Sequence, residues 1–210
     1  MRYAPDQKSR TRESIVTSAR RGFLARGFSG VGVDAIMKSA GMTAGGFYAH
    51  FESKQHLFTL ALDEAFESSM RFYLHGLDKL AGSDVVGELT RRYLSRAHRD
   101  HVDDGCPMSP LGADVARLGA EAQQLFEARI GQLLAVMMPA LPARPNFSPT
   151  EQALSLLALY AGGLMLSRAV STPALSDKML LACRKAARDV GRLPAKRSAI
   201  SQLPPSNEDR

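Results

Sequence analysis

Apolar residues recur at intervals of three and four positions along almost the whole chain. This spacing gathers apolar side chains on one face of a helix, and the alternating pattern typical of strands is missing. The segment Lys54–Leu80 shows it most clearly, with an apolar stripe of Phe58, Leu62, Phe66, Met70, Tyr73 and Leu77. The pattern therefore predicts an all-α fold of about nine helices. They are expected at Ser9–Arg26, Val33–Ala40, Ala44–His50, Lys54–Leu80, Asp84–His98, Leu111–Leu118, Ala120–Met138, Thr150–Val170 and from Ser176 to near Arg192.

Helix-terminating and helix-capping residues sharpen several of these boundaries. Gly27 and Gly41 follow predicted helices, at the position where glycine most easily takes a left-handed conformation. Ser148–Glu151 has the sequence of a capping box with proline at the first helical position, while the hydroxyls of Thr43 and Ser176 are expected to cap their helices. The helix after the capping box is apolar on almost every side, so it is expected to be buried on most sides.

Two short predicted helices flank the glycine turn of Ala40–Thr43 and follow a basic amphipathic helix. This is the layout of a helix-turn-helix, whose second helix enters the major groove of DNA. Ala35, Ile36 and Ala40 are expected to pack against Phe47. The candidate DNA contacts are the outward-facing residues of the second helix and a lysine that follows it: Thr43, Ala44, Gly46, Tyr48, His50 and Lys54.

Positive charge is concentrated at the same end of the chain. Residues 1–58 hold nine lysines and arginines against four acids, a net charge of +5 out of +6 for the whole protein. Such asymmetry is typical of a module that binds a polyanion. Arg10, Arg12, Arg20 and Arg21 fit either phosphate contacts or a solvated helix face.

The motif residues make the chain resemble the TetR family of transcriptional regulators. The resemblance rests on Gly27-Phe28, Ala40-Gly41, the run from Phe47 to Phe51, and Lys54, over about 50 residues. It implies a DNA-binding domain at residues 1–53 and a ligand-binding and dimerising domain at residues 54–193. Residues 194–210 are polar and are expected to be a disordered tail.

The chain departs from the family's pattern in three respects. Val31 and Gly32 stand where hydroxyl residues usually cap the second helix, and Ala49 stands where an aromatic residue is frequent. Ala44 and Gly46 replace larger side chains in the recognition helix, so direct contacts to bases are expected to be few.

The last two predicted helices match the family's dimerisation pair. Two adjacent glycines inside an apolar helix would permit close approach of a partner helix, either across a two-fold axis or within one subunit. The predicted dimer contacts are Leu156, Leu159, Gly162, Gly163, Cys183 and Ala186. In the family, aromatic and methionine residues of the middle helices line an inducer pocket, and the same residues also suit plain core packing. The predicted lining is Phe66, Met70, Tyr73, Tyr93, Met108, Phe126 and Met137.

A cluster of His98, His101, Asp103, Asp104 and Cys106 permits two sharper interpretations. Its donors could hold a metal ion, although an acidic turn after a helix explains the same residues. Arg99 and His101 could favour the Cys106 thiolate and make it a redox or electrophile sensor, whereas the two aspartates would oppose this by raising its pKa.

Cysteine content, the length of the apolar runs and the motifs that are missing limit the possible functions. Two cysteines and a charged start indicate a cytoplasmic protein, and the longest apolar run is too short to cross a membrane. No catalytic motif occurs, so neither an enzyme nor a cofactor is expected. The predicted function is a ligand-responsive repressor that binds a palindromic double-stranded operator as a homodimer and is released by a small molecule. A Cys106-based sensor, a sequence-indifferent DNA-binding protein and an activator stay open as alternatives.

Overall fold

The computed structural model describes residues 5–192 of the 210-residue chain, and within that range it is helical without strands. The tail expected at residues 194–210 lies outside the described residues. The α-helices are α1 (Pro5–Arg26), α2 (Val33–Ser39), α3 (Lys54–Leu74), α4 (Ser83–Tyr93), α5 (Arg96–Asp100), α6 (Met108–Leu118), α7 (Ala120–Met137), α8 (Pro149–Ala169) and α9 (Pro173–Gly191). Short 3₁₀ helices are η1 (Ala44–Ala49), η2 (Leu77–Lys79) and η3 (Met138–Ala140).

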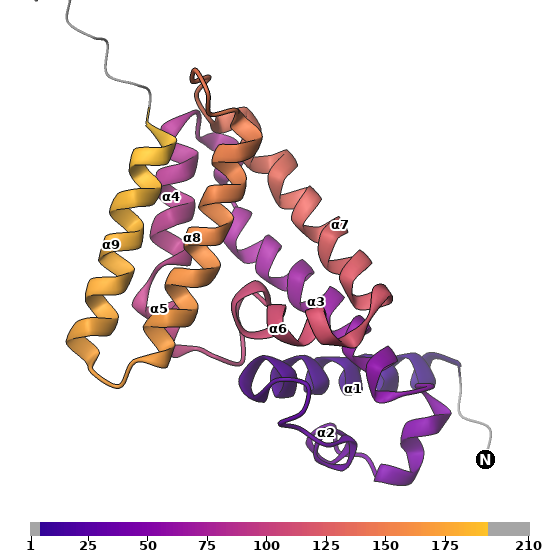
Figure 1. The fold of residues 1–210 in the computed structure, drawn as a ribbon. Helices are drawn as coiled ribbons and strands as arrows, with labels where there is room; N and C mark the ends of the chain where they lie inside the picture. The colour runs from indigo at the N-terminus through magenta and orange to yellow at the C-terminus, as the bar shows by residue number, and fades with distance from the viewer. Residues whose placement is uncertain (1–4, 193–210) are drawn as a thin grey trace, which may run out of the picture.

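The helices form a small N-terminal unit and a larger body (Figure 1). α1, α2 and η1 lie together at one end, and α3 rises from them into the body. α8 and α9 lie side by side, with α4 against α9 and α6 against both α7 and α8. Between residues 5 and 192, no helix combines the length and the apolar character needed to cross a bilayer.

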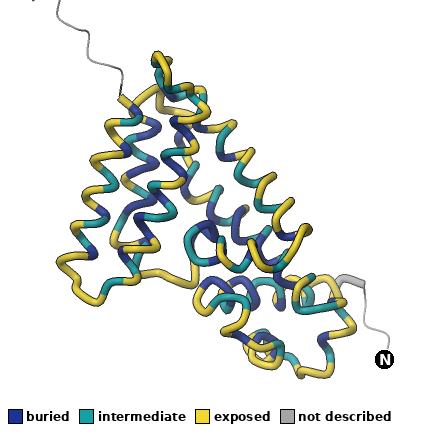
Figure 2. Tube along the Cα trace, viewed as in Figure 1, coloured by how far each residue is buried: buried dark blue, intermediate teal, exposed yellow. Residues whose placement is uncertain are grey.

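The apolar core is continuous between the two parts. It runs from Ile15 and Phe23 on α1 through Phe58 and Phe66 on α3 to Leu180 on α9, and buried positions follow the inward faces of these helices (Figure 2). α3 belongs to both parts, because its first half packs on α1 and its second half reaches α7 and α4. A movement of α3 would therefore be felt at both ends of the molecule.

Two long predicted helices are each broken. α3 ends at Leu74 and not near Leu80, because Gly76 takes the left-handed conformation (φ 70°) and turns the chain into η2. The helix expected at Asp84–His98 is divided into α4 and α5. There Ser95 has an extended backbone, and its hydroxyl accepts a hydrogen bond from the His98 amide, which starts a new helix.

The capping predictions have mixed outcomes. The capping box of Ser148 and Glu151 is confirmed, with both reciprocal hydrogen bonds present. The prediction for Thr43 is wrong, since its hydroxyl makes no capping bond. The prediction for Ser176 is also wrong: α9 begins earlier, at Pro173, and the Ser176 hydroxyl instead donates to the Ser167 carbonyl at 2.6 Å.

Candidate nucleic-acid interface and ligand cleft

The turn between α2 and η1 is fixed by backbone hydrogen bonds and by buried side chains. Gly41 takes a φ of 74°, which only glycine adopts without strain, and the Met42 amide donates to the Met37 carbonyl at 2.9 Å. Ile36, Met37 and Phe47 are fully buried beneath the turn. Ala35 is exposed, so the prediction that it packs against Phe47 is wrong. Hydrogen bonds and buried side chains thus hold the turn between α2 and η1 in this conformation.

The outward face of η1 presents one large side chain. Tyr48 is 79% exposed, and its ring is fixed edge-on against buried Phe47, with 5.1 Å between the ring centroids. Thr43 and Ala44 are exposed and Gly46 is partly exposed. With small residues around it, the Tyr48 hydroxyl is placed to donate to a phosphate or a base while the backbone approaches closely.

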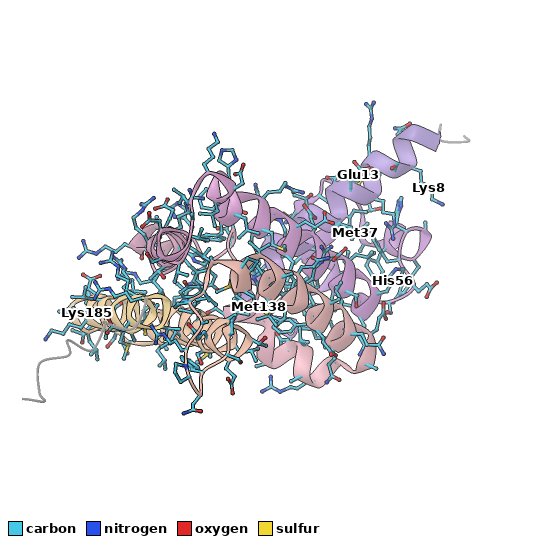
Figure 3. All side chains as sticks on the ribbon, turned by 90° about the horizontal axis from the view of Figure 1, so that it is seen from above. Lys8, Glu13, Met37, His56, Met138 and Lys185 are labelled. Carbon is cyan, nitrogen blue, oxygen red and sulfur yellow. The ribbon has the colours of Figure 1, made fainter. Side chains whose placement is uncertain are left out.

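The start of α1 gives this face its positive charge, and His50 lies close to it. The pKa of His50 is lowered, first by burial and then by the charges of Lys8 and Arg12. The Arg12 guanidinium lies 5.2 Å from the centroid of the Phe51 ring, beside η1. Figure 3 shows Lys8 at the same end of the molecule as Met37 and His56, far from Lys185 on α9. The basic side chains of α1 therefore flank the recognition element.

Two basic residues of this unit are engaged inside the protein. Lys54 donates to the Phe28 carbonyl at 2.6 Å, and its ammonium lies 4.3 Å from the centroid of the Phe28 ring. Burial lowers its pKa. Arg20 is only 7% exposed and pairs with Asp104 of the body at 2.6 Å. Of the two interpretations left open for Arg20, a solvated face and a phosphate contact, neither describes this position.

Two acidic side chains of the body form hydrogen bonds with the N-terminal unit. Asp104 pairs with Arg20 of α1, and Asp114 of α6 accepts a hydrogen bond from the Phe28 amide at 2.9 Å. The body is thereby bonded both to the middle of α1 and to the loop that follows α1. This connection could not be predicted from local sequence patterns, because the partners are more than 80 residues apart.

A cleft of about 930 Å³ opens between the end of α3, the end of α4, α5 and the loop at Asp104 and Gly105. Its volume lies within the range of small-molecule sites. Its walls hold three arginines, Arg71, Arg91 and Arg92, and three histidines, His75, His98 and His101. Phe72 and Tyr73 supply aromatic surface, and Asp104 is the single carboxylate in the described lining.

The predicted ligand residues are mostly core residues. Of the seven, Tyr73 lines the cleft, whereas the other six are not among its described lining residues, and their contact with a ligand stays a prediction. Phe66 and Phe126 pack against each other at 5.4 Å between ring centroids. Tyr93, Met108 and Met137 are buried, and Met70 packs against the core. These side chains pack in the core of the single chain, as plain core residues would.

Aromatic rings enclose His98 beside the cleft. Its Nδ1 donates to the Tyr93 carbonyl at 2.8 Å, and its Nε2 accepts from the Cys106 amide at 3.2 Å. Burial lowers the pKa of His98 to about 4, so the ring is neutral at physiological pH. Both ring nitrogens are occupied, which removes His98 as a metal ligand. In the part of the chain that the structure describes, no three His, Cys, Asp or Glu side chains gather to hold a metal ion.

Cys106 lies in the same buried cluster. Burial raises the pKa of its thiol, opposed by hydrogen bonding from the Tyr93 and Ser69 side chains. The sequence analysis attributed a raised pKa to the neighbouring aspartates, whereas loss of solvent is the main cause. A buried, protonated thiol is a poor nucleophile.

The paired helices α8 and α9 carry an exposed apolar face. Its described members, each between 44% and 50% exposed, are Leu154, Met165 and Leu166 on α8 and Leu175 and Leu181 on α9. The expectation that the helix after the capping box is buried on most sides is thus wrong for the single chain. About half of the side-chain surface at these positions is left for a partner to cover.

The dimer residues predicted from the sequence divide between this face and the interior. Leu156 is fully buried inside the subunit. At Gly163 a Cβ atom would meet the Cys183 sulfur at 2.7 Å, so this glycine allows close packing of α8 on α9 within one chain. Both residues thus serve packing within the single chain, and their contact with a second subunit stays a prediction. Gly162 has open space around it, Leu159 and Cys183 are half-buried, and Ala186 is exposed.

Comparisons with known proteins agree with this geometry. The model for bacterial regulatory proteins of the tetR family matches residues 15–61. The transcriptional repressor NemR of Escherichia coli K12 is 25% identical over 161 residues, covering 72% of this chain and 81% of NemR. The transcriptional regulator AcuR of Cereibacter sphaeroides is 39% identical over 123 residues, covering 56% of this chain and 54% of AcuR, so the match spans about half of that relative.

Solved structures show the same fold. A TetR regulator from Chloroflexus aurantiacus has a TM-score of 0.74 at 22% identity, covering 88% of this chain and 95% of its own. Reduced E. coli NemR has a TM-score of 0.72 at 20% identity, covering 89% of this chain and all of its own. AibR, solved with isovaleryl coenzyme A and operator DNA, has a TM-score of 0.63 at 17% identity, covering 84% of this chain and 97% of its own.

Proposed function

The chain belongs to the TetR family of transcriptional regulators, and from this we propose that it is a ligand-responsive repressor. It binds a palindromic operator as a homodimer in the cytoplasm, and it leaves the operator when a small molecule occupies the cleft. Residues 1–53 bind DNA, and the body from residue 54 binds the ligand and the second subunit. The observation that carries the proposal is the turn between α2 and η1, with Tyr48 projecting from it.

DNA contact falls to the outward residues of η1 and its flanks. Thr43, Ala44 and Gly46 bring the backbone close to the groove, and Tyr48 and His50 donate to phosphates or bases. Lys54 acts differently from the expectation, since its ammonium is bound to Phe28. It fixes the start of α3 beneath the recognition element, and any phosphate contact would compete with that bond.

Dimerisation follows from the exposed apolar face of α8 and α9. Exposed apolar side chains gathered on a pair of helices are typical of a protein interface. A two-fold axis through that face would present two recognition elements to one side of the DNA. Half-sites about 34 Å apart, one turn of the double helix, would then be bound together.

The release step uses the contacts between the body and the N-terminal unit. Asp104 lies in the wall of the cleft and also pairs with Arg20 of α1. The end of α3 forms another wall, and its first half packs on α1. A ligand that displaces either wall therefore changes the orientation of the recognition element, which lowers operator affinity. This is a coupling between two sites through α1 and α3.

The proposal is tested by fluorescence anisotropy on the DNA upstream of the protein's own gene, with random DNA of equal length beside it. We expect binding many-fold tighter to the upstream DNA. The variant Tyr48→Ala should weaken specific binding by roughly tenfold, the loss of one hydrogen bond and its packing against DNA. Phe72→Ala, which removes another largely exposed aromatic side chain, but on the body, is the matched control and should leave DNA affinity unchanged.

One observation favours a second candidate, a sequence-indifferent DNA-binding protein. Ala44, Gly45 and Gly46 offer no side chain long enough to read a base edge. The same titration separates the two candidates: equal, salt-sensitive binding to both DNAs supports the second and contradicts the first. The Cys106 sensor receives no comparable support, because the thiol is buried and its pKa is raised.

A further inference from the structure

The charge on the walls of the cleft is predominantly positive. Arg71, Arg91 and Arg92 line it, against the single lining carboxylate of Asp104. That carboxylate is already engaged by the buried Arg20 guanidinium at 2.6 Å. A positively charged ligand would thus find no free counter-charge among the described lining residues. A negatively charged one would find the exposed guanidiniums of Arg71 and Arg91, although Glu67 lies 3.8 Å from Arg71 and Glu88 binds Arg91.

The three arginines differ in their contacts and in their exposure to solvent. Arg92 donates to the carbonyls of Tyr73 and His75 and so fixes the end of α3. Arg71 and Arg91 are more than 60% exposed at the edge of the cleft. Glu88 binds both Arg91 and Arg92 through hydrogen bonds of 2.7 Å, so one carboxylate serves two guanidiniums. This arrangement holds Arg91 in place and leaves an excess of positive charge on the α4 wall.

Two further lining side chains, His98 and Tyr73, are uncharged. Burial lowers the pKa of His98 to about 4, which keeps the imidazole neutral. Burial also raises the pKa of Tyr73, so its hydroxyl stays protonated. Phe72 and Tyr73 add aromatic surface, with 5.1 Å between their ring centroids. The cleft therefore combines cationic side chains at its edge with the aromatic surface of Phe72 and Tyr73.

We propose that the cleft binds an organic anion, with its carboxylate at Arg71 and Arg91 and its apolar part against Phe72 and Tyr73. This inference rests on the proposed function, in that the cleft is taken to be the inducer site. Guanidinium groups bind carboxylates through charge-assisted, often bidentate hydrogen bonds. The volume of about 930 Å³ leaves room for a hydrocarbon or aromatic body much larger than the carboxylate itself.

The test uses two sets of probes, each with one carbon skeleton and three charges. The first is phenylbutyrate, its amide and phenylbutylamine, and the second is decanoate, its amide and decylamine. Binding to the full-length protein is measured by isothermal titration calorimetry without DNA. We expect the acids to bind in the millimolar range or tighter, the amides more weakly, and the amines not at all. An amide or amine that binds as tightly as its acid, or the absence of binding by both acids, overturns the proposal.

Variants then locate the anion. Arg91→Gln and Arg71→Gln should each weaken binding of the acids by roughly five- to tenfold and leave binding of the amides unchanged. Lys185→Gln removes one positive charge from the exposed surface of α9 and is the control, with no expected change (Figure 3). Equal affinities in all four proteins would place the acid elsewhere and refute the site.

The outcome is separable from that of the proposed function. Specific operator binding together with no preference for acids would overturn the proposed anion site and support the proposed repressor function. If the protein prefers acids but does not distinguish upstream from random DNA, the anion site is supported and the proposed repressor function is contradicted. Addition of the bound acid to the anisotropy assay then tests whether occupancy of the cleft releases DNA.

Discussion

The ion pair between Arg20 and Asp104 makes the connection between cleft and DNA-binding unit testable. Arg20 is 7% exposed, and its guanidinium has a second, more distant acid in Glu64 at 3.7 Å. Asp104→Asn removes the charge of the nearer partner and preserves the size and hydrogen-bonding oxygen of the side chain. Arg20→Gln removes the other charge. The double variant completes a thermodynamic cycle that isolates the pair.

The expected magnitude follows from distance and exposure. Two unit charges about 4 Å apart attract by about 4 kcal/mol at an effective dielectric constant of about 20. The Asp104 side chain is 60% exposed, so solvent screens much of this attraction, and Glu64 retains part of it for Arg20. We therefore expect a coupling energy of about 1 kcal/mol, measured from urea unfolding of the wild type, the two single variants and the double variant.

Operator affinity supplies the second measurement. Asp104 lies on the body, so Asp104→Asn should change operator affinity only through the position of α1. We expect a change of roughly threefold to fivefold, equivalent to most of the coupling energy. Asp177→Asn breaks an exposed pair with Arg96 on the body and serves as the control without effect. A coupling energy indistinguishable from zero, or identical operator affinities for Asp104→Asn and wild type, would refute the proposed connection.

Two further predictions concern the dimer and the buried histidine. Leu166→Glu places a charge on the exposed face of α8, so size-exclusion chromatography should show a monomer and operator affinity should fall at least tenfold; Leu80→Glu, outside that face, should remain a dimer, and a dimeric Leu166→Glu would contradict the interface. The pKa of His98 is about 4 in the folded protein against an ordinary 6.5, so the unfolded chain takes up the proton first. The resulting stability is complete above pH 6.5 and is lost as the pH falls toward 4, by at most about 3 kcal/mol. His98→Gln should remove this dependence in urea unfolding, whereas exposed His75→Gln should retain it; equal slopes in the two variants would contradict the assignment.

The helical fold and the recognition element could be predicted from the sequence because their signals are local. The 3.6-residue spacing of apolar positions, the capping box at Ser148 and the turn glycine Gly41 each act within a few residues. The breaks in the long helices were harder to predict. The apolar stripe continues through Leu77, yet Gly76 turns the chain, and Ser95 starts a new helix inside an unbroken pattern.

The cleft could not be predicted in the same way because its walls come from separate helices. Aromatic and methionine residues such as Phe66 and Phe126 looked like pocket residues, but the close packing of α3 on α7 buries them in the core. The cleft is instead lined by charged residues near helix ends. A weak signal existed in the adjacent Arg91 and Arg92, placed three and four residues after Glu88. Their meeting with Arg71 depends on the tertiary fold alone.

Asp104 both lines the cleft and pairs with Arg20 of α1, and this restricts how the ligand preference of the protein can change. A substitution at Phe72 or Arg91 alters the cleft and touches nothing in the N-terminal unit. A substitution at Asp104 alters the cleft and α1 together, so selection for a new effector at this position also selects for altered operator affinity. Libraries intended to convert the protein into a biosensor for another molecule should therefore vary the walls from α3 and α4 and keep Asp104. Effector choice could then be tuned while the uninduced expression level stays fixed.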